Sequence, residues 1–261
     1  MKKIIIAAVS LSVASTAALP ADMASRKTSG YAPPSASAPF FLDVAVGGAF
    51  NYAGSVNFIN PNGTAFTTNV TSGREIILSR QSKQSNGLGV YSGLGYFVTQ
   101  DLYIKAAYRH FGGQKFSGYA AFPGAAPAGD YQQVVNGYGN AALGGLGYKM
   151  KLSTNLYIDA AVEAGSVTLK ANGTQGVNLG STNGFLSSSK TNFAIGGSLG
   201  LGYKLSTDFD LIVNGTYHYL GKQSTGGPTR PGVSQQVVEQ LYSNKVSAVS
   251  ATAGLRYNFG L

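Results

Sequence analysis

The sequence predicts an all-β protein, a transmembrane antiparallel up-and-down β-barrel of eight strands, from three observations. The tetrad Gly-Leu-Gly-Tyr occurs at Gly93–Tyr96, Gly145–Tyr148 and Gly200–Tyr203, with a variant at Gly254–Tyr257. Their first glycines are 52, 55 and 54 residues apart (145−93, 200−145, 254−200), which is a structural period. Apolar and polar residues alternate between these landmarks, and only 11% of the residues are charged, against about 25% in a typical soluble domain.

Each repeat reads as a strand, a tight turn, a second strand and a long loop. The tight turns follow the first three tetrads, at Thr99-Gln100-Asp101, Thr154-Asn155 and Thr207-Asp208. We expect strands at about 40–52, 87–98, 102–111, 136–149, 156–167, 190–204, 209–220 and 246–259. A ten-stranded barrel and a four-bladed propeller are the alternatives, although a propeller needs about four strands per repeat and each repeat here has room for two.

The alternation along residues 102–109 has the period of a β-strand. Leu102, Ile104, Ala106 and Tyr108 lie on one face, and Tyr103, Lys105, Ala107 and Arg109 lie on the other. A soluble barrel of the lipocalin type points its apolar face inward, whereas a membrane barrel points it at lipid. Across the predicted strands the second face is mostly Gly, Ala, Asn and Ser with one or two charges. Such a face suits a narrow lumen better than a water-exposed surface.

Tyrosines recur at positions that suit the two membrane interfaces, where aromatic girdles form. One predicted girdle lies beside the short turns and consists of Tyr96, Tyr148, Tyr203 and Tyr257. The opposite girdle is expected at Tyr108, Tyr217 and Tyr219, with Tyr52. The alternative is that these tyrosines simply reflect the strand preference of the residue.

The N-terminus predicts export from the cytoplasm. Lys2-Lys3, an apolar stretch at 4–18 and small residues up to Ala21 form a secretory signal peptide over 1–21. Residues 22–39 are rich in Pro, Ser and Ala and predict an extended periplasmic lead-in, and 40–261 are expected to form one barrel domain. The chain has no cysteine, so neither a disulfide nor a thiolate metal site is expected.

The lengths of the connections orient the barrel. The turns after the tetrads are short, whereas the connections at about 53–85, 112–134, 168–189 and 221–244 are long. Short periplasmic turns and long external loops are typical of bacterial outer-membrane barrels. In the first long connection, the turn signal at Asn60–Gly63 and the apolar run Ile76–Leu78 predict an additional surface hairpin.

Charged residues recur on the predicted lumen face at matched positions. Lys105 and Asp159 each lie three residues beyond an aligned leucine, and Arg109 and Glu163 each lie seven beyond. His218 is equivalent to Arg109, and Arg256 is expected to pair with Asp210 near the periplasmic end. Because buried charges are tolerated when paired, we expect a lumen charge network of Lys105, Arg109, Asp159, Glu163, His218, Asp210 and Arg256. The alternative is a water-filled lumen in which these side chains are solvated.

Other classes of function have little support in the sequence. The two histidines, His110 and His218, have no nucleophile at a catalytic spacing, so no enzyme, metal site or cofactor is expected. The glycine runs do not open a helix as a dinucleotide loop requires. The formal charge of +9 is dispersed rather than gathered on one face, which argues against nucleic acid as a partner. Basic residues in the long connections suit contact with anionic lipopolysaccharide.

The chain resembles the porin-family outer-membrane β-barrel proteins of alpha-proteobacteria, relatives of the OmpA-type barrel. The resemblance rests on the signal peptide, the Ala21-Asp22 start, the Pro-rich lead-in, strand 102–109 and the closing strand up to Phe259. It implies a surface antigen or structural barrel in the outer membrane of a Gram-negative bacterium, delivered by barrel-assembly machinery that reads alternating Tyr257, Phe259 and Leu261. The usual terminal phenylalanine is followed here by two further residues.

The sequence therefore predicts a structural, surface-exposed outer-membrane barrel whose lumen is filled by side chains. The first alternative is a small passive channel for ions or small solutes. The second is an adhesin or haem-binding receptor that acts through its loops on an external ligand or host surface.

Overall fold

The computed structural model describes residues 39–59, 75–122, 129–176, 182–227 and 240–260. All of them belong to one compact unit, Ala36–Leu261. These ranges contain eleven strands: β1 (Phe40–Tyr52), β2 (Ser55–Ile59), β3 (Glu75–Ile77), β4 (Ser79–Ser82), β5 (Gln84–Phe97), β6 (Leu102–Phe122), β7 (Gly129–Lys151), β8 (Leu156–Gly176), β9 (Thr182–Lys204), β10 (Phe209–Ser224) and β11 (Gln240–Phe259). No helix among the described residues is long and apolar enough to cross a membrane.

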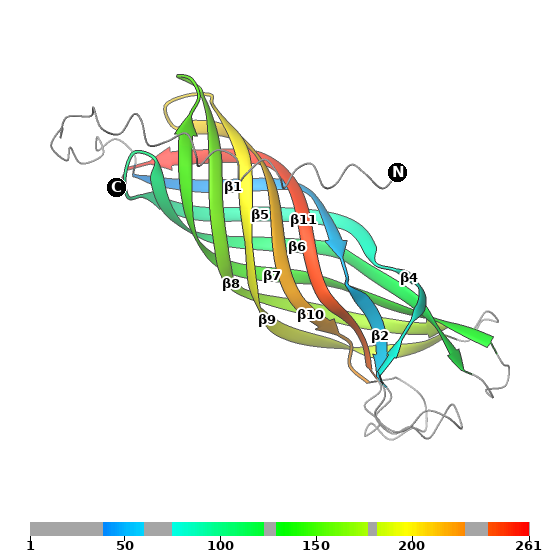
Figure 1. Cartoon of the computed structure of the whole chain (residues 1–261). Helices are drawn as coiled ribbons and strands as arrows, with labels where there is room; N and C mark the ends of the chain where they lie inside the picture. The colour runs from blue at the N-terminus through cyan, green and yellow to red at the C-terminus, as the bar shows by residue number, and fades with distance from the viewer. Residues whose placement is uncertain (1–38, 60–74, 123–128, 177–181, 228–239, 261) are drawn as a thin grey trace, which may run out of the picture. The chain divides into compact units, whose positions relative to one another are not determined.

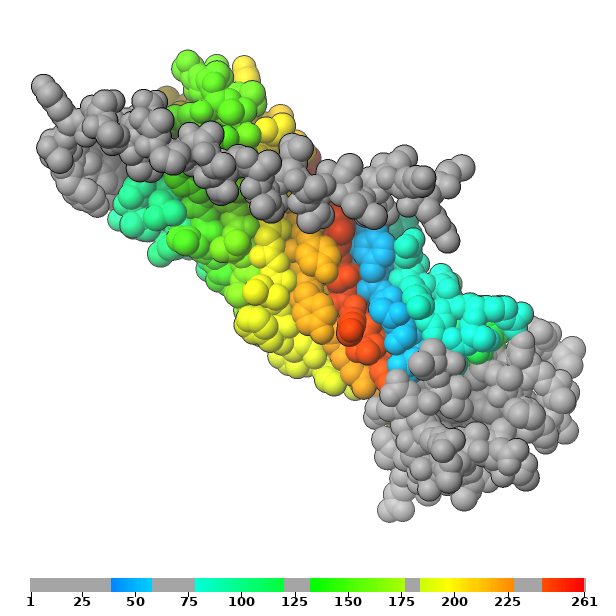
Figure 2. Space-filling model, in the orientation of Figure 1, coloured from blue at the N-terminus to red at the C-terminus, as the bar shows by residue number. Residues whose placement is uncertain are grey.

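Eight long strands close into an antiparallel ring (Figure 1). The ring closes because β1 pairs with β5 on one side and with the last strand, β11, on the other. The seam runs from Phe40 opposite Phe259 to Tyr52 opposite Ser247, and Figure 2 shows β11 in red beside β1 in blue. The prediction of an eight-stranded barrel is confirmed, and neither ten wall strands nor propeller blades are present in the described residues.

The three short strands lie at the end of the barrel remote from the tight turns. β2 pairs with β11 and with β3, and β4 pairs with β6. The pairing of Asn57–Ile59 with Glu75–Ile77 confirms the additional hairpin expected in the first long connection. Its predicted turn, Asn60–Gly63, lies outside the described residues.

The long connections are much shorter than the sequence predicts, because the strands continue into them. β6 extends to Phe122, β8 to Gly176, and β9 begins at Thr182, so most of the predicted loops 112–134 and 168–189 are barrel wall. The polar residues in these segments look like loop sequence, but they are interspersed with buried Phe116, Leu169 and Phe185. A wall that projects beyond lipid still buries its inner face while its outer face meets water.

The outer surface of the barrel carries an apolar belt. Side chains of the outward parity are exposed on every ring strand, including Leu42, Val44, Leu94, Ile104, Leu146, Val162, Leu199, Leu201, Val213 and Leu255. Contiguous apolar patches of this extent are rare on soluble monomers, whereas an outward apolar band is what a lipid-facing barrel requires. We therefore assign the outward-pointing side chains of the ring strands to the lipid-facing surface.

The four tetrad tyrosines lie on the outer face of the barrel near the turn end, and their role as an interfacial girdle stays a prediction. Tyr96, Tyr148, Tyr203 and Tyr257 are between 40 and 50% exposed. Phenylalanines adjoin these tyrosines along the seam: the ring of Phe40 lies 5.1 Å from that of Tyr96 and 5.7 Å from that of Phe259, which stacks on Tyr257 at 5.6 Å. Tyr108, Tyr217 and Tyr219 are exposed further along the same outer face, and the opposite girdle that they are expected to form likewise stays a prediction.

The three tight turns share one hydrogen-bonding pattern. In each, a hydroxyl oxygen accepts the backbone N–H of the first residue of the next strand: Thr99 from Leu102 at 3.0 Å, Ser153 from Leu156 at 3.1 Å, and Ser206 from Phe209 at 3.1 Å. The sequence aligns Thr99 with Thr154 and Thr207, and this alignment is off by one residue. The preceding serine makes the bond in the second and third turns.

The second glycine of each full tetrad makes room for an aromatic ring inside the barrel. Gly95 lies opposite Phe41, Gly147 opposite Tyr103, and Gly202 opposite Tyr157. A Cβ atom at any of these glycines would overlap the ring of its partner. The repeat is therefore a lumen-packing motif: a large ring on one strand lies over a bare backbone on the next.

Replacement of Gly147 by Ala tests this motif. The added methyl group meets the Tyr103 ring, and overpacking of this kind costs about 1–3 kcal/mol. Gly144→Ala on the same strand is the matched control, because its Cβ has an open site with its nearest atom 4.0 Å away. We expect urea unfolding in lipid vesicles to show a lower free energy of unfolding for Gly147→Ala only. Equal stability of the two variants would contradict the packing role.

Candidate functional site in the barrel lumen

The inward faces of the strands bring the predicted charges together in the lumen. All seven are buried, as are two charges that the sequence analysis did not select, Asp43 on β1 and Lys149 on β7. The set contains four carboxylates (Asp43, Asp159, Glu163, Asp210), four lysine and arginine side chains (Lys105, Arg109, Lys149, Arg256) and His218. The formal charges of the carboxylates and of the lysines and arginines therefore cancel inside the barrel (4−4).

Glu163 on β8 is the centre of the first group of charges, which we call the Glu163 cluster: Glu163, Lys105, Arg109 and His218. Arg109 binds the carboxylate with two nitrogens, Nε to Oε2 at 2.7 Å and NH2 to Oε1 at 2.8 Å. Lys105 Nζ lies 2.6 Å from Oε1, and His218 Nε2 lies 2.9 Å from Oε2. One buried carboxylate thus joins β6, β8 and β10 across the lumen.

The strand register explains why these particular residues meet. One row of the sheet runs from Lys105 to Gly145, Glu163, Gly196 and His218 across five strands. Glycine separates each charged residue from the next, so the side chains can lean over the bare backbone: a Cβ at Gly145 would lie 3.2 Å from Glu163 Cγ and 3.3 Å from Lys105 Cε. The sequence matches Lys105 in depth with Asp159, but strand stagger places it level with Glu163 instead.

Arg256 on β11 is the centre of the second group, the Arg256 cluster: Arg256, Asp43 and Asp159. Its Nε and NH2 bind Asp43 at 2.7 and 2.9 Å, and NH2 also lies 2.9 Å from Asp159 Oδ2. Tyr103 donates a hydrogen bond to the other oxygen of Asp159. Asp159 belongs to β8, so this cluster also spans the lumen.

The predicted pair of Arg256 and Asp210 is wrong. The two residues are direct neighbours in the β10–β11 register, but Arg256 is directed to Asp43 and Asp159. Asp210 instead accepts a hydrogen bond from Tyr157 at 2.8 Å and lies 3.5 Å from Lys149 Nζ. The arginine reaches two carboxylates at once in the observed arrangement, which compensates its buried charge better than one partner would.

Aromatic rings fill the space around the charges. Arg109 lies 4.2 Å from the centre of the Tyr91 ring, and the hydroxyl of Tyr91 donates to Asp43 at 3.1 Å, so this tyrosine connects the two clusters. Arg256 lies 4.1 Å from the Phe41 ring, and Lys149 lies 3.7 Å from the Tyr157 ring. Cation–π contacts of this type strengthen when water is excluded.

An apolar core fills the outer part of the lumen, beyond the Glu163 cluster. Its fully buried members come from seven strands or the segments beside them and include Val56, Leu78, Phe111, Phe116, Val135, Leu169, Leu220, Leu241 and Val246. The ring of Phe111 lies 5.7 Å from that of His218, where the core meets the charges. At the turn end, Phe41, Phe97 and Tyr103 pack with centroids 5.1 to 5.6 Å apart. The charged layer is therefore enclosed between two packed layers.

The remaining selected residues lie outside the charge network. His110 on β6 is half-buried at the outer surface, and its Nδ1 lies 2.7 Å from Asn140 Oδ1. Within the described ranges, no group of three or more His, Cys, Asp or Glu residues is arranged to hold a metal ion. Of the proposed assembly signal, Tyr257 and Phe259 lie on the outer face of β11, and Leu261 lies outside the described residues.

Sequence reasoning missed five lumen residues: Asp43, Tyr91, Lys149, Tyr103 and Tyr157. The signal for them was present, because each has the inward parity of its strand. Asp43 and Lys149 lie on strands that are not part of the aligned repeat pairs, so depth matching did not select them. Tyr103 is on the predicted lumen face but has no predicted partner, and Tyr91 and Tyr157 are assigned no role, yet a tyrosine of lumen parity near a carboxylate is a natural hydrogen-bond donor.

Comparisons with known proteins return small membrane barrels. The structure is similar to Neisserial surface protein A (14% identity, 85% of this chain and 99% of that chain, TM-score 0.42) and to the outer membrane protein OprG from Pseudomonas aeruginosa (14%, 86% and 98%, 0.43). It is also similar to the outer membrane protease OmpT from Escherichia coli (12%, 89% and 100%, 0.43). No family model and no curated protein matches the sequence. These values transfer no activity to the chain.

The architecture itself is that of an outer-membrane β-barrel protein. The ring has eight antiparallel strands, short turns at one end, an exposed apolar belt and aromatic residues at its borders, the features that distinguish such barrels from soluble ones. The lumen holds charges that are almost entirely paired with one another. The buried charges in the lumen therefore compensate one another, and their side chains have little access to solvent.

Replacement of Glu163 by Gln tests the central position of this residue. The variant leaves Lys105, Arg109 and His218 around a neutral amide, and breaking a buried ion pair costs about 3–5 kcal/mol. We expect a loss of this size in urea unfolding from lipid vesicles. Asp208→Asn, at an exposed turn position, is the control and should change stability by less than about 0.5 kcal/mol. A Glu163→Gln variant as stable as the control would show that the cluster is not a stabilising element.

Proposed function

We propose that the protein is a structural, surface-exposed barrel of the Gram-negative outer membrane, with a lumen closed to ions and solutes. Residues 1–21 act in this proposal as a cleaved signal peptide, and the barrel-assembly machinery inserts the mature chain. The role assigned to the barrel is to reinforce the membrane and to carry its outer strands and connections at the cell surface. No catalytic step and no cofactor belong to the proposal.

The observation that carries the proposal is the occupation of the lumen by the Glu163 cluster. Glu163 and His218 are at most 2% exposed, and the ion pairs run from β6 through β8 to β10. A hydrated ion can pass only if this arrangement is displaced, which exposes uncompensated charges at a cost of several kcal/mol. The interior of an eight-stranded barrel is just wide enough for side chains to fill it.

The apolar core adds a second barrier in series with the charges. Phe116, Val135, Leu169 and Leu241 are fully buried in the outer part of the lumen. A packed hydrocarbon layer offers no polar group to a permeating ion, whose dehydration is costly. This layer supports the closed barrel over the passive channel, because a channel needs a continuous polar path from end to end.

Planar-bilayer recordings of the refolded protein test the proposal. We expect no unitary current from the wild type. Arg109→Ala should also remain silent, because the apolar core still blocks the lumen. The combination of Arg109→Ala with Phe116→Ala and Leu241→Ala removes material from both barriers and should produce measurable current.

Heat-modifiable migration in detergent gels provides the control that each variant is a folded barrel before it is recorded. Steady current through the wild type, little changed by these substitutions, would overturn the closed barrel in favour of a passive channel for ions or small solutes. Current through the single variant Arg109→Ala would show that the charged layer closes the lumen and that the apolar core does not.

A further inference from the structure

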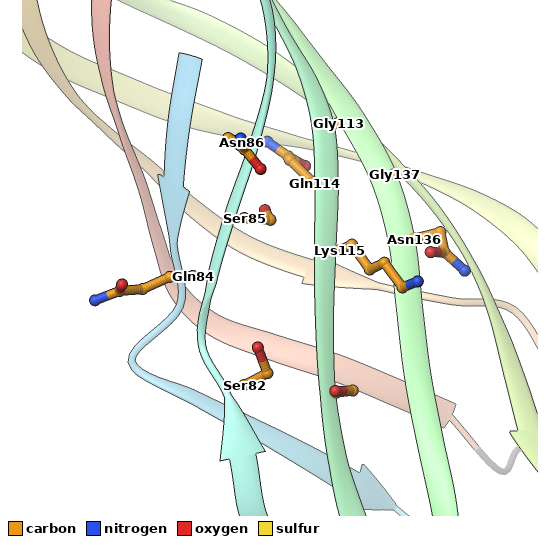
Figure 3. Close-up of a pocket in the computed structure, with 10 residues that line it drawn as sticks. Ser82, Gln84, Ser85, Asn86, Gly113, Gln114, Lys115, Asn136 and Gly137 are labelled. Carbon is orange, nitrogen blue, oxygen red and sulfur yellow. The ribbon is translucent and has the colours of Figure 1, made fainter. Parts of the chain in front are cut away.

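Two polar concavities adjoin on the outside of the barrel, over β4 to β9. The first has a volume of about 480 Å³, and its lining includes Asn86, Gln114, Lys115 and Asn136 (Figure 3). The second has a volume of about 360 Å³, and its lining includes Tyr138, Lys170 and Asn172. Asn136 and Gly137 line both. The two concavities are therefore neighbours on the barrel wall, and we call them together the β5–β9 groove.

The first concavity lies where the pairing of β6 with β5 and β4 is interrupted. β5 and β6 pair only as far as Gly89 opposite Phe111, and β4 resumes the pairing at Ser82 opposite Ser117. Between these points, Gly113 adopts a φ of +65° within a β-bulge of β6. Asn51 from the lumen donates to the carbonyl of Gly112 at 2.9 Å. A bulge that re-aims side chains and ends strand pairing is a frequent device beside functional sites.

The floor of the groove is built from ordered amides. Gln114 lines the first concavity, is only 1% exposed, and accepts a hydrogen bond from Gln223 at 2.6 Å. The same Gln223 nitrogen donates to the carbonyl of Lys170 at 2.9 Å. Gly137 permits this contact, because a Cβ there would overlap the Gln223 side chain. The groove is thus backed by a fixed polar network inside the barrel.

The residues that line the groove match the chemistry of an acidic saccharide. Asn86, Asn136 and Asn172 offer amide donors and acceptors that match sugar hydroxyls. Tyr138 offers an aromatic ring, and Lys170 lies 5.8 Å from its centre. Lys115 and Lys170 are exposed, and none of the described residues that line either concavity is acidic. Two lysines without a carboxylate partner in the groove suit phosphate or carboxylate groups on the sugar.

The height of the groove points to a ligand in the same membrane. The hydroxyl of Tyr108, in the outer girdle, donates to Asn140 on β7 at 3.0 Å. Tyr138 is two residues further outward on that strand, about 7 Å at the rise of a β-strand, and Asn136 is two residues beyond it. The groove therefore begins where the apolar belt ends, at the level of lipid headgroups.

We propose that the β5–β9 groove binds the phosphorylated sugar headgroup of lipopolysaccharide in the surrounding outer leaflet. Lys115 and Lys170 contact the anionic groups, Asn136 lies between them against the sugar hydroxyls, and Tyr138 packs on a sugar face. The inference rests on the outer-membrane location proposed above but not on the closed lumen, and binding is measured without any conductance readout.

The test uses the full barrel folded in detergent and measures binding by isothermal titration calorimetry. The probe is a rough-type lipopolysaccharide that consists of lipid A and inner-core sugars. The double variant Lys115→Glu/Lys170→Glu should weaken binding on the order of tenfold or more, as reversal of contacting charges does. The matched control is Lys151→Glu/Lys204→Glu, which reverses two exposed lysines at the turn end of the barrel and should bind like the wild type.

Two further arms identify the source of the saccharide. Enzymatically dephosphorylated lipopolysaccharide should bind more weakly than the intact probe to the wild type, and this difference should shrink in the Lys115→Glu/Lys170→Glu variant. A soluble sulfated oligosaccharide should bind more weakly than the lipid. Equal affinity of the groove variant and the wild type for the intact probe would overturn the site. A soluble oligosaccharide that binds as tightly as the lipid, and loses affinity in the groove variant, would overturn the lipid as its ligand.

Discussion

The pairing of buried charge inside a narrow ring is the constraint on which the rest of the structure depends. Four carboxylates and four lysine and arginine side chains share a space that excludes bulk water, and each carboxylate contacts one of these basic groups at 3.5 Å or less. A single unpaired member would carry a desolvation penalty of several kcal/mol. The strand register, the glycines between the charged positions and the aromatic rings around them all serve to bring these groups into contact.

The need to pack rings and charges inside the narrow ring explains the repeated glycines. In the three full tetrads the second glycine lies beneath an aromatic ring, whereas in the fourth copy Arg256 occupies that place. The repeat therefore makes room for three aromatic rings from neighbouring strands, and its fourth copy places one charged side chain at the same end of the lumen. Recurrence of one strand motif gives the wall its period, and the replacement of the second glycine by Arg256 in the fourth copy places an arginine in the lumen.

The sequence predicts the wall of this barrel well and the contacts within it less well. Alternation along residues 102–109 and its equivalents determines which side chains point inward, and Lys105, Arg109, Glu163 and Asp159 all do. Parity is a local property, so one sequence suffices to read it. The partner of each charge depends on the stagger between strands, which is why Lys105 was matched with Asp159 and Arg256 with Asp210. The extensions of the strands beyond the apolar belt are not predicted, because their outward-facing residues are as polar as those of loops.

The bond between Arg256 and Asp43 joins residues 213 positions apart, on the last and the first strand of the ring. A slip of this seam by one residue turns every side chain of β11 to the opposite face. A slip by two keeps the faces but moves Arg256 away from the carboxylate opposite it, leaving a guanidinium buried beside the wrong neighbours. The closing strand thus carries its own test of correct register, because only one alignment of β11 on β1 brings the buried guanidinium to its carboxylate.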